Sequence, residues 1–315
     1  MNLTLRQLQI FEAVARNLSF TKASAELHLS QPAVSMQVKL LEEAANVSMF
    51  ERVGKSLQLT EAGQLMLRHC IAFRRQMEEL QDELAHLKGA ELGTLRLAVP
   101  GTANAFVAIF VAEFCNRHPG VGFNLSIANR AGLLKHLADN DTDLIIMGEP
   151  PANLNLVGER FMDNPLVIIA PPEHPLARRK RQVAFDQLIR HDFVVREQGS
   201  GTRIAMERFC ATRNVALQAT MEVSSNESLK QAVAAGLGLG IVSIHTLELE
   251  LAMNKVVVVN AEAFPIMRMW YLVRREAKEL PPVAAAFQEF VMTEGQALWP
   301  LATGTPARFP GSVDR

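Results

Sequence analysis

Residues 29–41 have the sequence LSQPAVSMQVKLL, which predicts a helix with two different faces. Ser30 is a typical N-terminal cap, and Pro32 is tolerated in the first turn, where its missing N–H costs nothing. One face is apolar and carries Val34, Val38 and Leu41. A different, polar face carries Gln31, Ser35, Met36 and Lys39. A helix of this kind can pack against the rest of its domain through its apolar face and form hydrogen bonds with a partner through its polar face.

Two shorter helices are predicted before this one. The first has an apolar face made of Leu8, Phe11 and Ala15. The second runs from about Thr21 to Leu27, with Ser19 or Thr21 as its cap. Two short helices, a tight turn and a third helix with a polar front predict a helix-turn-helix. The alternative is a small helical bundle whose third helix is simply solvated.

Residues 51–59 predict a short hairpin around Gly54. Arg52 and Lys55 flank that glycine, where a β-wing could contact phosphates beside a DNA groove. The net charge of the whole chain is −1, and residues 1–60 carry six Lys and Arg against five Glu. Charge therefore gives no general affinity for nucleic acid, and any DNA binding must use one local surface.

Residues 61–90 predict one long helix. Its apolar positions are spaced 4-3-4-3-4-3, which is a heptad seam. The seam consists of Met66, Cys70, Phe73, Met77, Leu80, Leu84 and Leu87. This pattern favours pairing with a second copy of the chain, and two paired recognition helices would read a dyad operator. The alternative is an amphipathic helix that lies on its own domain.

Residues 91–300 alternate short β-branched runs with helical stretches, the pattern of α/β units. The predicted chain crosses between two lobes near residues 161–165 and again near 264–267. We therefore expect lobe I to contain residues 91–163 and 268–300, and lobe II to contain residues 164–267. A double crossing of this kind builds a hinged cleft. The tail, residues 301–315, is rich in Thr, Gly and Pro and is expected to be disordered.

Helix starts rich in Thr, Ser, Asn and Gly, together with several arginines, are expected to line this cleft and to suit a phosphorylated or carboxylated small molecule. The candidate effector-binding residues are Thr102, Ala103, Asn104, Asn129, Arg130, Met147, Gly148, Arg196, Gln198, Ser200, Thr202, Arg203 and Asn226. Two alternatives stay open. The Ser and Thr side chains can be plain helix caps, and Arg196 or Arg203 can be a structural partner of Glu197 or Glu222.

Several classes of protein and site are excluded by the sequence. The three cysteines are widely spaced, so we expect no disulfide framework and no metal site. The glycines of residues 236–240 follow a predicted helix rather than a strand, opposite to a dinucleotide-binding turn. No signal peptide and no run of about 18 apolar residues is visible, so we expect a cytoplasmic protein without a membrane partner. No nucleophile motif predicts a catalytic residue, and we expect no enzyme and no cofactor.

Five segments resemble the DNA-binding head of LysR-type transcriptional regulators. They are LRQL at 5–8 with Phe11, SFTKA at 19–23, LSQPAVS at 29–35, MFERVGK at 49–55 and LTEAG at 59–63. The resemblance implies an α+β winged helix-turn-helix head (residues 1–60), a long linker helix (61–90) and a two-lobed α/β periplasmic-binding-protein-like effector domain (91–300). It also implies a DNA-binding dimer or tetramer, with RNA polymerase as a further candidate partner. The expected DNA-binding residues are Thr21, Lys22, Ser30, Gln31, Pro32, Ser35, Met36, Lys39, Arg52 and Lys55.

A narrower similarity, over about residues 3–295, is to regulators of Calvin-cycle (RuBisCO, cbb) operons. Its segments are residues 129–130, 138–148, 166–172, 195–203 and 224–227. It implies control of carbon-fixation genes, with NADPH or a sugar phosphate as effector. The alternatives are a LysR-type regulator of another metabolic operon, a solute-binding protein, or an enzyme on the same two-lobed fold. An enzyme would need a proton acceptor in the cleft, where Glu197 is the only clear candidate.

Overall fold

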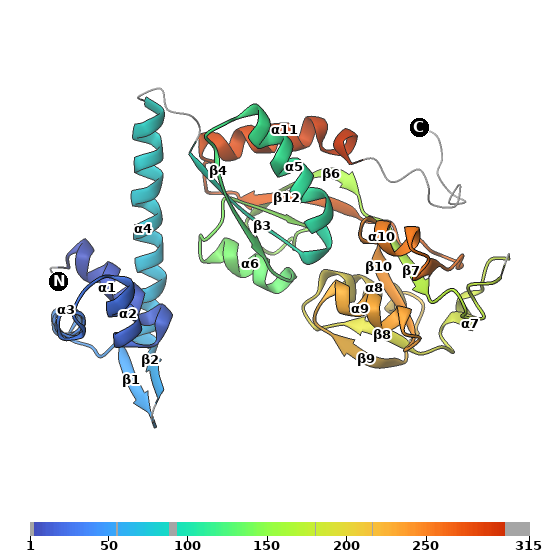
Figure 1. The fold of residues 1–315 in the computed structure, drawn as a ribbon, viewed down its shortest axis with the longest axis horizontal. Helices are drawn as coiled ribbons and strands as arrows, with labels where there is room; N and C mark the ends of the chain where they lie inside the picture. Colours follow the sequence, from blue (N-terminus) through green and yellow to red (C-terminus); the bar gives the residue numbers. More distant parts are fainter. Residues whose placement is uncertain (1–2, 55, 88–92, 180, 216, 300–315) are drawn as a thin grey trace. The chain divides into compact units, whose positions relative to one another are not determined.

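The computed structural model describes residues 3–54, 56–87, 93–179, 181–215 and 217–299 (Figure 1). It contains two compact units, the first made mainly of residues 1–89 and the second of residues 90–138 and 142–315. No helix among the described residues is long and apolar enough to span a membrane. The predicted disordered tail, residues 301–315, lies outside the described residues.

The first unit begins with three helices and a hairpin. Their bounds are α1 (Leu5–Asn17), α2 (Phe20–Glu26), α3 (Gln31–Ala45), β1 (Phe50–Val53) and β2 (Ser56–Leu59). The Ser30 hydroxyl caps α3 by accepting from the Ala33 N–H, and Ser19 rather than Thr21 caps α2. The apolar backs of the helices meet in a core that includes Phe11, Val34 and Leu41. The predicted winged helix-turn-helix is therefore confirmed.

Helix α4 (Glu61–Leu87) follows the hairpin. The Thr60 hydroxyl accepts from the Gly63 N–H at 3.0 Å and donates to the Ser48 carbonyl at 2.8 Å, which ties the start of α4 to the head. Cys70 of the heptad seam is buried in the head core. Beyond it the seam is open: Phe73 is 49% exposed, Met77 41%, Leu80 46% and Leu84 49%. The side chain of Leu87 lies outside the described ones.

The second unit contains two mixed sheets, and the first has the order β4-β3-β5-β12-β6. Its strands are β3 (Thr94–Val99), β4 (Gly122–Ile127), β5 (Leu144–Met147), β6 (Leu156–Asp163) and β12 (Met269–Arg275). Helices α5 (Asn104–Arg117) and α11 (Pro282–Leu298) cover one face, and α6 (Arg130–Ala138) covers the other (Figure 1). Strands β3, β4 and β5 are parallel, so their carboxyl ends lie at one edge of the sheet.

The second sheet has the order β11-β7-β10-β8-β9. Its strands are β7 (Leu166–Ala170), β8 (Phe193–Arg196), β9 (Ala219–Val223), β10 (Leu239–Ser243) and β11 (Val257–Val258). The short helix α7 (Phe185–Leu188) and α8 (Gly201–Ala211) pack on one face, and α9 (Asn226–Ala234) packs on the other. A further short helix, α10 (Glu248–Ala252), follows β10. The chain enters this sheet after β6 and leaves it before β12, which confirms the two-lobed α/β fold.

Two of these strands are absent from the sequence-based expectation. Strand β6 has Gly158, Glu159 and Arg160 at its centre, so it lacks the β-branched run that marks a strand. It forms because it pairs antiparallel with β12 along its length, apart from a register shift at Phe161, and β12 lies more than a hundred residues later. Strand β9 is mostly exposed and pairs only along one side, with β8. Partners distant in sequence decide both strands.

Candidate functional site

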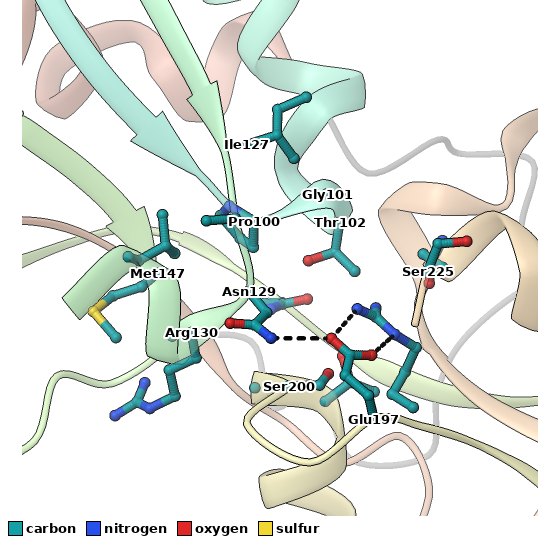
Figure 2. Close-up of a pocket in the computed structure, with 18 of the residues that line it drawn as sticks. Pro100, Gly101, Thr102, Ile127, Asn129, Arg130, Met147, Glu197, Ser200 and Ser225 are labelled. Carbon is teal, nitrogen blue, oxygen red and sulfur yellow. Dashed lines mark hydrogen bonds and ion pairs between the residues drawn. The ribbon is translucent and has the colours of Figure 1, made fainter. Parts of the chain in front are cut away.

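A pocket of about 340 Å³ is lined by residues of both lobes (Figure 2). Lobe I contributes the segments that follow the carboxyl ends of β3, β4 and β5. Lobe II contributes the starts of α8 and α9. In open α/β sheets, ligands bind outside the carboxyl ends of the strands, at such crevices. The position of the pocket thus matches the cleft expected from the sequence.

Three helix starts face this pocket. A short 3₁₀ turn, η1 (Gly101–Ala103), leads into α5, and the other two starts are those of α8 and α9. Free N–H groups at a helix start favour bound anions. Thr102, Ser200 and Asn226 are buried there, and their side chains have no hydrogen-bond partner among the described residues. Their unused hydrogen-bonding groups are available to a ligand.

The presence or absence of a capping hydrogen bond distinguishes side chains that only cap a helix from side chains that can bind a ligand. Ser225 is a cap, since its hydroxyl accepts from the Ser228 N–H at 3.0 Å. Asn129 is also a cap, since its Oδ1 accepts from the Gly132 N–H at 3.0 Å. Ser200 occupies the cap position of α8 but makes no capping bond. Of these three residues, Ser200 is the one whose side chain makes no capping bond, so its hydroxyl can bind a ligand in the pocket.

A buried indole lies in the same pocket lining. Trp270, on β12, is only 2% exposed, and its Nε1–H has no hydrogen-bond partner in the described part of the chain. A buried N–H donor without a partner costs about 1–3 kcal/mol, so a ligand acceptor or a water that reaches it would be stabilising. Its ring packs edge-on against Phe106 at 5.6 Å between centroids, which holds the indole in place. Within the described chain, the indole N–H is thus an unpaired buried donor in a residue that borders the pocket.

Glu197 joins residues from both lobes (Figure 2). It accepts from Arg196 Nε at 2.8 Å and from Arg196 Nη2 at 3.0 Å, and Asn129 Nδ2 donates to it at 3.4 Å. Arg196 is thus a structural partner of Glu197, the alternative left open by the sequence. The charge of this carboxylate is thus paired with Arg196 at the pocket wall.

Arg268 and Gly148 depend on each other. A Cβ added at Gly148 would meet the Arg268 guanidinium, whose Cζ would lie only 3.1 Å away. Arg268 Nη1 donates to the Gly201 carbonyl at 2.9 Å, across to the start of α8. Burial, followed by the nearby Arg130 and Arg208, lowers the pKa of Arg268 from its ordinary value. Gly148 therefore belongs to the site because it leaves room for an arginine.

Most of the predicted effector-binding residues come together here. Those that line the pocket are Thr102, Asn129, Arg130, Met147, Gly148, Arg196, Ser200, Thr202 and Asn226. Four others do not line it. Ala103 is buried in the hydrophobic core, and Asn104 and Gln198 are exposed beside the pocket. Arg203 is occupied by Glu207 at 2.6 Å.

Sequence reasoning missed part of the lining. The additional residues include Pro100, Ile127, Asn164, Arg268 and Trp270. Arg268 and Trp270 come from the second crossing and from β12, more than a hundred residues after β5. One feature of the sequence could have predicted Arg268 as a lining residue, namely that it is an arginine next to the predicted second crossing. A segment that crosses between two lobes borders the cleft between them.

The described candidate DNA-binding residues belong to α2, to α3 and its N-terminal cap, and to β1. Gln31, Met36 and Lys39 are exposed on α3, with Ser35 half-buried. Lys39 pairs with Glu43 at 3.7 Å on the exposed surface, a pair too weak to keep the lysine from a phosphate. The rest of the set, Thr21, Lys22, Ser30, Pro32 and Arg52, is also exposed. Lys55 lies outside the described residues.

Two family models match the chain. Residues 5–64 match the bacterial regulatory helix-turn-helix protein model of the lysR family, and residues 88–296 match the LysR substrate binding domain. The first range contains the helices and the hairpin of the head. The second contains both sheets and the pocket.

One relative and two solved structures are similar over long stretches. A RuBisCO operon transcriptional regulator of Allochromatium vinosum is 49% identical over 294 residues, which span 93% of this chain and 97% of that protein. The regulatory domain of Synechocystis PCC6803 CcmR, solved in complex with 2-PG, is 36% identical with a TM-score of 0.61, covering 64% of this chain and 96% of that one. Full-length CbnR, solved with its target DNA, has a TM-score of 0.72 over 92% of this chain and 99% of that one. At 18% identity, CbnR supports the fold alone.

Proposed function

Because this chain belongs to the LysR family of DNA-binding transcriptional regulators, we propose that it controls carbon-fixation genes and responds to a small phosphorylated metabolite. Membership of this family makes the chain a regulator rather than an enzyme. The metabolite would bind in the pocket between the two lobes, and the head would bind a dyad operator.

One observation carries the effector part of this proposal: three helix starts converge on a pocket in which the side chains of Thr102, Ser200 and Asn226 have no hydrogen-bond partner in the described part of the chain. Their polar atoms are not sealed from solvent, so a ligand or an ordered water in the pocket can form the hydrogen bonds that the protein leaves unmade. Helix starts select an anion over a neutral molecule.

The volume of the pocket bears on the size of that anion. About 340 Å³ is near the lower end of the range for small-molecule pockets. This favours a molecule of sugar-phosphate size over a dinucleotide such as NADPH. The relative CcmR has a regulatory domain solved in complex with 2-PG, and 2-PG is therefore the first compound to test.

For DNA, we propose that α3 lies in the major groove, with four residues nearest the base edges: Gln31, Ser35, Met36 and Lys39. Arg52 on the hairpin, and Lys55 beside it in sequence, would contact phosphates. The exposure of Gln31 and Met36 on α3 and of Arg52 on β1 supports this assignment.

Pairing of α4 would supply the second head. The seam residues Phe73, Met77, Leu80 and Leu84 are each more than two-fifths exposed, which is unusual for a row of large apolar side chains. A Met77→Glu variant is expected to sediment as a smaller species than the wild type. The matched control is Gln76→Glu, which adds the same charge at an exposed neighbouring position. An unchanged sedimentation coefficient in Met77→Glu would contradict the pairing.

The deciding experiment is footprinting of the full-length chain on DNA upstream of the RuBisCO genes of its own genome. 2-PG, sugar phosphates and NADPH are each added, and DNA bending is measured in parallel. We expect protection of a dyad site, with a change of protection or bend angle for at least one phosphorylated compound. Differential affinity for two states of the protein is needed for any such change.

The outcomes separate the parts of the proposal. Identical protection and bending with every compound would remove the effector. Protection of another operon but not of the carbon-fixation promoter would leave a LysR-type regulator with a different target.

A further inference from the structure

A second pocket, of about 280 Å³, lies beside α8 in the same unit. Three arginines line it: Arg130 at the start of α6, Arg208 on α8, and Arg268 just before β12. Arg130 and Arg268 also line the main pocket, so the two pockets share part of a wall. In Figure 2 the side chain of Arg130 extends away from Glu197 and Thr102. Its guanidinium is thus directed away from the polar cluster of the main pocket.

The positive charge of this second pocket is only partly compensated: Glu149 favours the charged forms of Arg130 and Arg268 but forms no ion pair with them in the described part of the chain. Arg130 Nη2 donates to the Glu149 carbonyl at 2.7 Å, and Arg268 Nη1 donates to the Gly201 carbonyl at 2.9 Å. Both bonds go to main-chain oxygens, which carry no full charge. The guanidinium of Arg208 makes neither a hydrogen bond nor an ion pair within the described residues. The lining contains one acidic residue, Glu149, and it is exposed with no guanidinium within ion-pair distance.

The three arginines also repel one another. Burial first, and then Arg208, lowers the pKa of Arg130. Burial, Arg130 and Arg208 together lower the pKa of Arg268. Close like charges that are partly removed from water are unfavourable unless an anion offsets them. Such an arrangement is common where arginines bind phosphate groups, because a guanidinium can donate two parallel hydrogen bonds to one oxyanion.

We propose that this second pocket binds a phosphate-type oxyanion between Arg130, Arg208 and Arg268. The anion would join the two lobes, because Arg130 belongs to the first lobe and Arg208 to the second. It would also hold Arg268, whose other face borders the main pocket. The pocket would bind this anion whether or not the chain controls carbon-fixation genes.

Calorimetric titration with inorganic phosphate tests the site. All proteins are full-length and carry Thr102→Ile, which removes the Thr102 hydroxyl from the main pocket and narrows it, and the ionic strength is held constant. Adding Arg208→Gln is expected to weaken phosphate binding about tenfold, since one charge-assisted contact is lost. Adding Arg181→Gln, which removes the same charge from an exposed position outside the lining, is expected to leave binding unchanged.

Either of two results would overturn the proposal: no saturable phosphate binding in the Thr102→Ile protein, or equal binding with and without Arg208→Gln. Circular dichroism melting of each variant ensures that only folded protein is compared. A parallel titration with glycerol 3-phosphate identifies the source of the anion. If it binds more tightly than phosphate and depends on Arg208, the pocket is specific for a phosphate ester; if it binds less tightly, the pocket is specific for free phosphate.

Discussion

Replacing Gly63 by alanine is expected to destabilise the DNA-binding head, although the same change normally stabilises a helix. Gly63 lies in the first turn of α4, beside the hairpin. A Cβ there would overlap the Met49 carbonyl oxygen and lie 2.9 Å from Leu59 Cδ2. The Met49 carbonyl is main chain, and it accepts a hydrogen bond from the Thr60 N–H at 3.1 Å. It cannot rotate away as a side chain could.

Two opposing terms decide the magnitude. Alanine in place of glycine gains about 0.5–1 kcal/mol in a helix from lower chain entropy. Forcing an extra methyl group into a closely packed contact costs roughly 1–3 kcal/mol. We expect the steric term to dominate, with a net loss of about 1–2 kcal/mol. For a unit of this size, each kcal/mol lowers the melting temperature by about 4–8 °C.

The assay uses the placement of the fluorescent residues. The chain has two Trp and one Tyr, and Trp270, Tyr271 and Trp299 are all in the second unit. Fluorescence melting of full-length Gly63→Ala should therefore match the wild type, while circular dichroism should show an earlier loss of helix. The control is Gly295→Ala in α11, where the added Cβ would make contacts of 3.4 Å to Phe110 and should be neutral or stabilising. A Gly63→Ala protein whose helices melt at or above the wild-type temperature would refute the reasoning.

Three further predictions concern the head and the main pocket. Gln31→Ala should weaken specific DNA binding by about 1–3 kcal/mol and leave metabolite binding intact, as measured by fluorescence anisotropy with specific and scrambled duplexes. Thr102→Ile should abolish the effect of the metabolite on DNA bending while basal DNA affinity is kept; loss of DNA binding in folded protein would contradict the separation of the two surfaces. Burial, with a contribution from Glu12, raises the pKa of the Cys70 thiol from its ordinary value of 9.0 to about 12. Because the folded pKa is above the unfolded one, this contribution to stability is complete below about pH 9 and declines toward pH 12, so Cys70→Ala should flatten the alkaline loss of stability seen by circular dichroism.

The sequence predicts local elements well because their signals are local. Ser30 and Pro32 mark the start of α3, and residues three or four apart show which face is buried. The heptad spacing of α4 is equally visible, because the side chains that share a helix face are close in sequence. The alternation of strands and helices in residues 91–300 likewise indicates the α/β class, and the helix starts indicate where an anion could bind.

The tertiary structure alone decided which polar groups have partners. Nothing in the sequence distinguishes the roles of Arg196, Arg203 and Arg268. In the structure, Arg196 pairs with Glu197 and Arg203 pairs with Glu207. Arg268 instead extends over Gly148 to the start of α8. Trp270 and strand β6 reach their places only because β12 returns to the first sheet after the whole second lobe. Hydrophobic periodicity indicates which residues close in sequence share a face of a helix or strand. Ion pairing and strand pairing instead depend on which residues are close in space. Those neighbours are set when segments a hundred residues apart bury their apolar faces together.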